Sequence, residues 1–313
     1  MNVVNIIFNI LTSGMPACIL ALGVFLTFRL LDFADMTAEG SFLTGGAIAI
    51  AMINAGINPF LATLCGMLGG ACCGFITGTL HTKLGIPKLL SGIITMTATT
   101  SIALLILGTG KEGSFFGNNI TLSTDAVTIY SMFYNIDAPQ FNSMIRAAVM
   151  LIVVLLVFLV AYYFFGTEYG AAIRATGMNG RMARAQGINT NISTIAAVSI
   201  SNALIGLAGA LFVQEQRSCD IKSASGFLVI GLASILIGEA IFGKRSFKNW
   251  LISVGLGAII YFTIVTLAIE FGLDTNLKYL LYAILITLAL CLPLIKGKGK
   301  ELLDKFKEKK EAN

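Results

Sequence analysis

The sequence predicts an all-α integral membrane protein: a polytopic helix bundle of about 8–10 transmembrane helices with a broken or re-entrant element near its N-terminus. Three observations lead to this prediction. Of the 313 residues, 56% are hydrophobic and only 12% are charged. Mean hydropathy is +0.86, which leaves too little polar surface to cover a water-soluble globule of this size. Long charge-free runs recur along the chain, and the basic residues gather in the connections between them.

A helix needs about 20 apolar residues to cross the hydrocarbon core. The run 40–80 contains the turn signal Asn54 to Pro59, so we expect a helix on either side of it. The shorter run 223–238 is either a span or a re-entrant element. The charge-free runs that predict the other spans are 1–28, 89–110, 147–165, 188–214, 250–269 and 279–295.

The front of the chain is compatible with two topologies, because Arg29 and three acids lie between the first two apolar runs. If both runs cross completely, there are roughly nine spans and the N-terminus is outside. If one is broken or re-entrant, there are fewer and the N-terminus is inside, which is the interpretation we prefer. No Lys or Arg precedes Arg29, so we expect no cleaved signal peptide.

Charge placement predicts the orientation. The tail 296–313 has seven Lys against four acids, which indicates a cytoplasmic end near anionic lipid. Alternating sides from there puts the polar stretch 166–191 and Lys244 inside, and the loop 111–143 outside. We therefore divide the chain into a transmembrane domain, 1–295, and a Lys-rich cytoplasmic tail. The tail lacks the interleaved aromatic residues of a nucleic-acid binder, so we expect no nucleic-acid partner.

Small residues predict one tight helix contact. Glycines that recur every fourth residue lie on one face of a helix, and such a face lets helix backbones approach closely in lipid. We expect helix packing, not ligand binding, from Gly66, Gly70, Gly74 and Gly78.

No catalytic set or metal cluster is found in the sequence. The segment 238–245 nearly fits a phosphate-binding loop, but Arg245 stands where the magnesium-binding Ser or Thr is needed. His81 is the only histidine and has no carboxylate near it in sequence. We expect a chain that is not an enzyme and binds no cofactor, so that ATP and Mg²⁺ act only through a partner.

The polar stretch 166–191 is long for a connection between spans. Its composition favours short helices broken at Gly177, Gly180 and Gly187, which suit docking into a groove of a soluble partner. From residue chemistry alone, an ordinary basic inside loop explains it equally well. Candidate partner-coupling residues are Glu168, Arg174, Gly177, Asn179, Arg181, Arg184 and Gly187.

Several motifs resemble the permease subunits of ABC importers of the branched-chain amino acid and ribose type. They are Arg174-Ala-Thr-Gly, Asn179, Ala183, Gly187-Ile-Asn and Gly206-Leu-Ala-Gly209. The segments 31–42, 81–87 and 90–97 resemble most closely the branch named for tryptophan and tyrosine transport. The resemblance covers roughly 14–294. It departs at Met178, where the family often has an acid, so no ion pair is expected there.

The resemblance implies that 166–191 contacts a cytoplasmic ABC ATPase. It also implies a second permease copy, an external substrate-binding protein and a multi-pass location in the bacterial cell membrane, with the C-terminus cytoplasmic. The substrate would be a small solute: the family branch implies an amino acid, and its name points to an aromatic one, with a sugar or nucleoside as the alternative. A different class, an ion-coupled secondary transporter, would require an essential buried acid such as Glu239 or Glu270 and inverted repeats.

Polar residues near the front are costly in lipid, so they face water, a pore or another helix. Broken helices often build transporter sites, and the resemblance puts this segment near the translocation path. Glu239 either lines the path or caps a helix. The candidate pathway residues are Asp32, Asp35, Thr37, Glu39, Ser41 and Glu239.

Overall fold

The computed structural model describes residues 3–108, 119–123, 126–133, 142–221, 225–272, 277 and 280–288. The Lys-rich tail and parts of the loop 111–143 lie outside these residues. The helices are α1 (Val3–Phe25), the π-helix η1 (Leu26–Leu30), α2 (Thr37–Asn54), α3 (Pro59–Leu84), α4 (Lys88–Gly108), α5 (Asn142–Gly166), α6 (Glu168–Met178), α7 (Gly180–Ala185), α8 (Thr190–Gln216), α10 (Phe227–Phe242) and α11 (Phe247–Glu270). Residues 280–288 are also helical, and η2 (Ser131–Phe133) is a short 3-10 helix.

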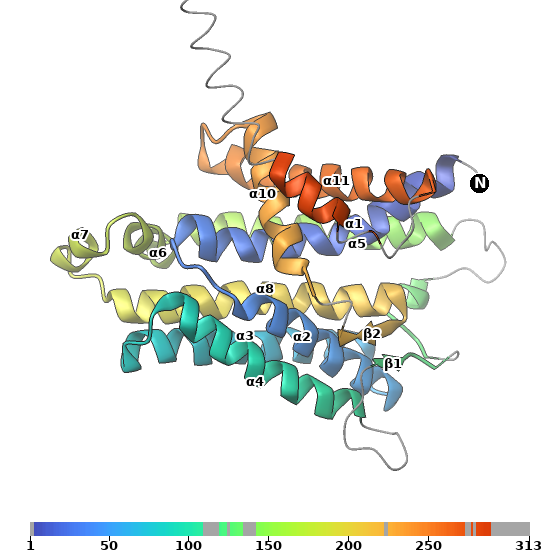
Figure 1. Cartoon of the computed structure of the whole chain (residues 1–313), viewed down its shortest axis with the longest axis horizontal. Helices are drawn as coiled ribbons and strands as arrows, with labels where there is room; N and C mark the ends of the chain where they lie inside the picture. Colours follow the sequence, from blue (N-terminus) through green and yellow to red (C-terminus); the bar gives the residue numbers. More distant parts are fainter. Residues whose placement is uncertain are drawn as a thin grey trace, which may run out of the picture.

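The fold is the predicted all-α polytopic bundle (Figure 1). Within the described residues, six helices are long and apolar enough to cross a membrane: α1 continued by η1, α3, α4, α5, α8 and α11. α2 and the shorter α10 pack among them. At 1.5 Å per residue, α10 is only about 24 Å long, less than the thickness of a hydrocarbon core.

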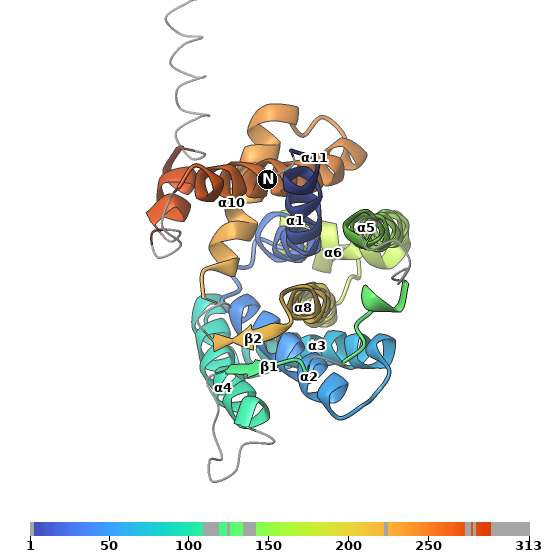
Figure 2. The ribbon, with the colours of Figure 1, turned by 90° about the vertical axis from the view of Figure 1, so that its right-hand side faces the viewer.

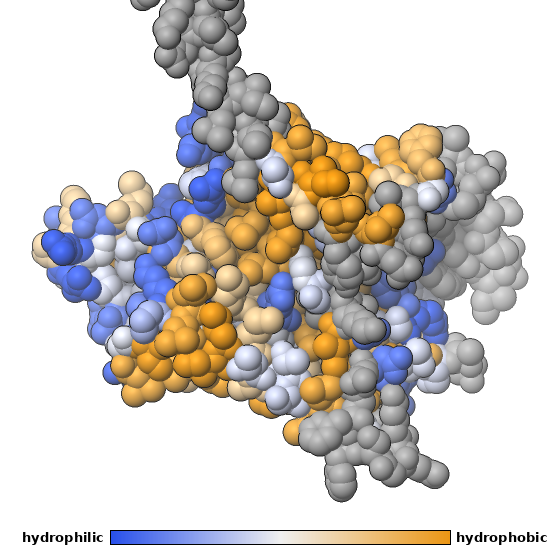
Figure 3. Space-filling model, viewed as in Figure 1, coloured by the Kyte–Doolittle hydropathy of each residue, from blue (hydrophilic) through white to orange (hydrophobic). Residues whose placement is uncertain are grey.

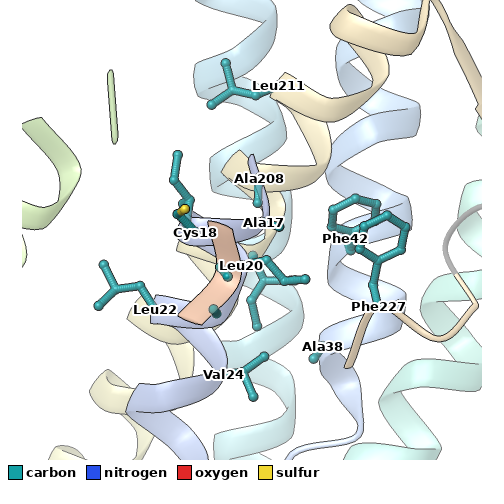
Figure 4. Packing of buried hydrophobic residues seen from close by; sticks show 14 of the residues in the cluster. Ala17, Cys18, Leu20, Leu22, Val24, Ala38, Phe42, Ala208, Leu211 and Phe227 are labelled. Atoms are coloured by element: carbon teal, nitrogen blue, oxygen red, sulfur yellow. The ribbon is translucent and has the colours of Figure 1, made fainter. Parts of the chain in front are cut away.

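α8 lies at the centre of one half of the bundle and packs on α3, α2 and α1 (Figure 2). The apolar core joins these helices to α10 and α11. There the rings of Phe42 and Phe227 stack with centroids 4.0 Å apart (Figure 4). The outer sides of α3, α4 and α5 expose large apolar side chains such as Leu68, Ile93 and Leu155, and apolar surface is extensive in Figure 3. These sides face lipid.

One face of α3 packs against α8 and α2 through four glycines: Gly66, Gly70, Gly74 and Gly78. A Cβ on Gly66 would lie 2.6 Å from the Gly45 carbonyl oxygen, and one on Gly78 would lie 2.9 Å from the Cα of Ile195. Both distances are too short for a real Cβ. The helices therefore meet backbone to backbone.

The helix break near the N-terminus is present between η1 and α2. Residues 32–35 are neither helix nor strand, and Asp32 has a φ of 51°, in the left-handed region. The backbone groups here find partners. Phe33 N–H donates to the Thr27 carbonyl oxygen at 2.9 Å, and Lys88 Nζ donates to the Asp32 carbonyl oxygen at 2.7 Å. Irregular backbone at membrane depth is tolerated where it is satisfied in this way.

The preferred position of the N-terminus, on the same side as 166–191, is wrong. α1 begins at the end of the bundle opposite α6 and α7 (Figure 1). It runs antiparallel to α11, because Gly14, earlier in α1, lies against Phe262, whereas Phe25 at its end packs on Trp250 with ring centroids 4.8 Å apart. The break comes only after α1 has crossed, and it therefore does not reverse the side of the chain's beginning.

A small antiparallel sheet was not predicted. Strand β1 (Asn119–Thr121) pairs with β2 (Ser218–Asp220), with Asn119 opposite Asp220 (Figure 2). Both strands have three residues, too few to carry a periodic hydrophobic pattern.

Candidate functional site

α6 and α7 project beyond the ends of α5 and α8 as a polar extension of the bundle (Figures 1 and 3). Side-chain caps start both helices. Thr167 Oγ1 accepts from the Gly170 N–H at 3.3 Å, and Asn179 Oδ1 accepts from the Met182 N–H at 3.1 Å. The expected break at Gly177 is absent, because α6 continues through it to Met178 and the helix changes at Asn179. We call residues 167–189 the projecting segment.

One face of the projecting segment is open to solvent. Met178 and Met182 are 87% and 62% exposed, and Arg184 Nη1 donates to Thr190 Oγ1 at 3.0 Å. The predicted coupling residues on this exposed side are Glu168, Asn179, Arg181, Arg184 and Gly187.

The other two predicted coupling residues, Arg174 and Gly177, turn towards the bundle. The Arg174 guanidinium carbon lies 5.0 Å from the ring centroid of Phe247, at the start of α11. Gly177 lies against the carbonyl group of Leu30 so closely that a Cβ would collide with the carbonyl oxygen. Arg174 therefore attaches α6 to α11, and Gly177 attaches α6 to η1. Neither residue belongs to the exposed side of the projecting segment.

Beyond η1, the irregular segment 32–35 leads to a buried polar cluster between α2, α3 and α8. Asp35 is fully buried; its Oδ1 accepts from the Thr37 N–H at 2.9 Å and its Oδ2 from Asn202 Nδ2 at 2.6 Å. Ser41 Oγ donates to Asn202 Oδ1 at 2.7 Å, and the hydroxyl oxygens of Thr37 and Thr77 are 2.6 Å apart. No ion pair to Asp35 is present in the described part of the chain.

The depth of this cluster follows from its position on α8. Asn202 lies about 18 Å along the helix from Thr190, near the middle of the bundle. Amide, hydroxyl and carboxylate groups there satisfy one another, as buried polar groups must. Three candidate pathway residues, Asp35, Thr37 and Ser41, are thus brought together inside one chain.

The remaining candidate pathway residues lie elsewhere. Asp32 is exposed, and Glu39 Oε1 accepts from the Gly226 N–H at 3.0 Å, where α10 begins. Glu239 Oε2 pairs with Arg29 Nη2 at 2.6 Å, and its Oε1 accepts from Trp250 Nε1 at 2.8 Å. These two side-chain contacts join η1, α10 and α11, and neither of them is a helix cap.

Sequence reasoning missed the partners that hold these groups. Asn202 is an amide inside an otherwise apolar run, and a polar residue within a span is itself a signal of function or packing. Arg29 was used only as a boundary marker, although a charge that ends a span needs a partner. Trp250 and Phe247 gave no signal. Among the described residues, no group of three or more His, Cys, Asp or Glu could hold a metal ion.

The lipid-facing bundle, the broken helix with its buried polar cluster and the projecting segment are the features of a multi-pass transport permease. Residues 6–290 match the family described as branched-chain amino acid transport system / permease component, and the chain belongs to this family. It is a permease of the ABC transporter class, and a transport component in the cell membrane.

Curated relatives agree with this. The chain is 33% identical over 312 residues to a tyrosine transport system permease protein of Clostridioides difficile, covering 98% of this chain and 99% of the relative. It is 30% identical to a probable branched-chain amino acid transport permease of Methanocaldococcus jannaschii, over 75% and 72% of the two chains. A galactofuranose transporter permease of Escherichia coli is 26% identical over 80% and 69%. No solved structure matches.

Proposed function

We propose that the chain is the membrane subunit through which an ABC importer moves an aromatic amino acid, tyrosine in the first place, into a bacterial cytoplasm. The choice of substrate is supported by the similarity to the tyrosine permease, which is 33% identical over almost the full length of both chains. The branched-chain amino acid permease supports the wider class of amino acids.

The partner ATPase docks on the exposed side of the projecting segment. Two features support this assignment. Met178 and Met182 are large apolar side chains left open to water, and exposed apolar groups among polar ones are typical of interaction sites. Arg181 and Arg184 lie beside them on α7 and can pair with carboxylates of a partner. ATP and Mg²⁺ then act in the partner and not in this chain.

A direct route leads from this docking face into the membrane. A movement of α6 acts on the carbonyl group of Leu30 through Gly177. Leu30 ends η1, and the irregular residues that follow lead to Asp35, which accepts from Asn202 in the polar cluster. We infer that ATP-driven displacement of the projecting segment shifts the start of α2 relative to α8, and that this opens and closes the path. The other three candidate acids lie where these helices begin or end. Asp32 follows η1, Glu39 binds the start of α10, and Glu239 near the end of α10 pairs with Arg29 of η1.

The remaining parts of the assembly are proposed from the same family relationship. Two copies of the chain form the path, an external binding protein delivers the solute, and the Lys-rich tail and the projecting segment face the cytoplasm.

Two other substrates or mechanisms are less well supported. Sugar permeases match at lower identity and over less of their length. Of the two acids considered for an ion-coupled mechanism, Glu239 is held by Arg29 and Trp250, and Glu270 is exposed at the end of α11. The family relationship favours ABC transport over it.

Uptake in reconstituted vesicles tests the proposal. The chain is co-reconstituted with its partner ATPase, and the external binding protein is added. Uptake of labelled tyrosine into the vesicles is measured in the presence of ATP. We expect ATP-dependent uptake that unlabelled tyrosine suppresses and galactose does not. Suppression by galactose alone would overturn the substrate, and uptake without the ATPase would overturn the mechanism.

A further inference from the structure

A cavity of about 700 Å³ lies where α5 ends and where α6 and α11 begin. Two aromatic residues of α5, the caps of the other two helices and two cations contribute to its walls: Tyr162, Tyr163, Thr167, Ser246, Arg174 and Lys248. It is separate from the polar cluster around Asp35, and the transport mechanism proposed above does not use it.

The cavity is positively charged. Arg174 and Lys248 are its only charged wall residues, and neither forms an ion pair in the part of the chain that the structure describes. Arg174 Nε is buried and has no hydrogen-bond partner there. The Arg174 guanidinium packs on the Phe247 ring, and a buried donor without a partner is costly, so an anionic acceptor that reached this group would be favoured.

Two helix N-termini add to this charge. Thr167 caps α6, and Ser246 Oγ caps α11 by accepting from the Asn249 N–H at 3.2 Å. Helix N-termini favour anions through the helix dipole and free N–H groups, and the four N-terminal N–H groups of a helix have no partner within it. Both helices begin at the wall of the same cavity. Its chemistry therefore fits a phosphate group.

The cavity lies at the membrane boundary. α5 and α11 are both candidate spans, and the cavity is at the last turn of one and the first turn of the other. Tyr162 and Tyr163 are 44% and 68% exposed, and the apolar side chains of Leu155 and Leu159 continue the exposed surface along α5. Tyrosines gather at the level of lipid headgroups, next to the hydrocarbon core.

We propose that this cavity binds the headgroup phosphate of an anionic phospholipid, with the acyl chains lying along the exposed side of α5. Arg174 and Lys248 hold the phosphate, and the tyrosine rings mark the depth of the headgroup. A lipid is favoured over a carboxylate of the partner ATPase, because the cavity borders lipid-facing α5 whereas the outward side of α6 and α7 faces the partner. Because the projecting segment faces the cytoplasm in the proposed function, the bound lipid would belong to the cytoplasmic leaflet. Only this choice of leaflet rests on the proposed function.

Lipid binding to the purified full-length chain tests this proposal. Native mass spectrometry measures retention of phosphatidylglycerol and phosphatidylcholine by the unaltered chain and by Lys248→Gln. The matched control is Lys244→Gln, because Lys244 is also exposed, lies four residues earlier in the connection before α11, and does not line the cavity. We expect phosphatidylglycerol to bind better than phosphatidylcholine. Lys248→Gln should weaken phosphatidylglycerol about fivefold, and Lys244→Gln should leave it unchanged.

Three results would overturn the proposal. The first is equal binding of the two lipids, or an equal loss in both variants. The second is competition by soluble glycerol phosphate at the affinity of the lipid, which would identify a free-anion site. The third is loss of ATPase co-purification in Lys248→Gln with lipid retention unchanged, which would assign the cavity to the partner protein. Because Lys248 is exposed, its replacement should leave the elution profile of the chain unchanged.

Discussion

Replacing Gly177 with Ala tests whether α6 acts on η1 through direct backbone contact. The added methyl group would collide with the Leu30 carbonyl oxygen, and one partner must then withdraw by roughly an ångström or more to restore normal contact. Overpacking of this kind costs about 1–3 kcal/mol, which corresponds to roughly fivefold to 150-fold in an equilibrium constant. Gly180→Ala is the matched control, because a Cβ there meets nothing within 4 Å.

The assay is ATP-driven uptake per assembled transporter, measured beside ATP hydrolysis by the partner. We expect Gly177→Ala to lower uptake at least about fivefold, while the ATPase still binds and hydrolyses ATP. Gly180→Ala should retain normal uptake. Normal uptake in both variants would refute the inference that the contact at Leu30 transmits movement.

Three further outcomes are expected. Asp35→Leu removes the acceptor of the Thr37 N–H and one of the two acceptors of Asn202 Nδ2, so the free energy of unfolding in detergent should fall by about 1–3 kcal/mol per unpaired group, whereas Asp32→Leu should have little effect. Gly70→Leu should prevent folding, because its side chain would enter the backbone of α8; an unaltered melting temperature would contradict the packing. Glu239→Gln should lower stability by about 1 kcal/mol, and a gain would show that the ion pair is not stabilising.

The sequence predicted the features that have a local pattern. Charge-free runs indicated the spans, and a four-residue glycine period indicated the face of α3 that meets α8. A polar stretch between two spans indicated the position of the projecting segment. In each case one short stretch of sequence carries the whole signal, since helix period and hydrophobicity act over neighbouring residues.

Features that depend on distant contacts could not be predicted. Asp35 and Asn202 are far apart in the sequence, and nothing near either residue identifies the other. The same holds for Arg29 with Glu239. The prediction for the side of the N-terminus was wrong for a related reason. The acids after Arg29 indicate that the helix breaks, but they do not show that α1 has already crossed the bundle before the break. Of the coupling residues, Arg174 looks like its neighbours in sequence, and only the fold turns it towards Phe247.

The proposed mechanism depends on the ATPase binding the exposed side of the projecting segment. A photo-crosslinking residue placed at Met182 in the assembled transporter measures this most directly. Met144 is the control position, because it is also exposed but lies at the start of α5, whereas the projecting segment follows the end of α5. We predict a crosslink to the ATPase from position 182 and none from position 144. A crosslink from position 144 and none from position 182 would contradict the account.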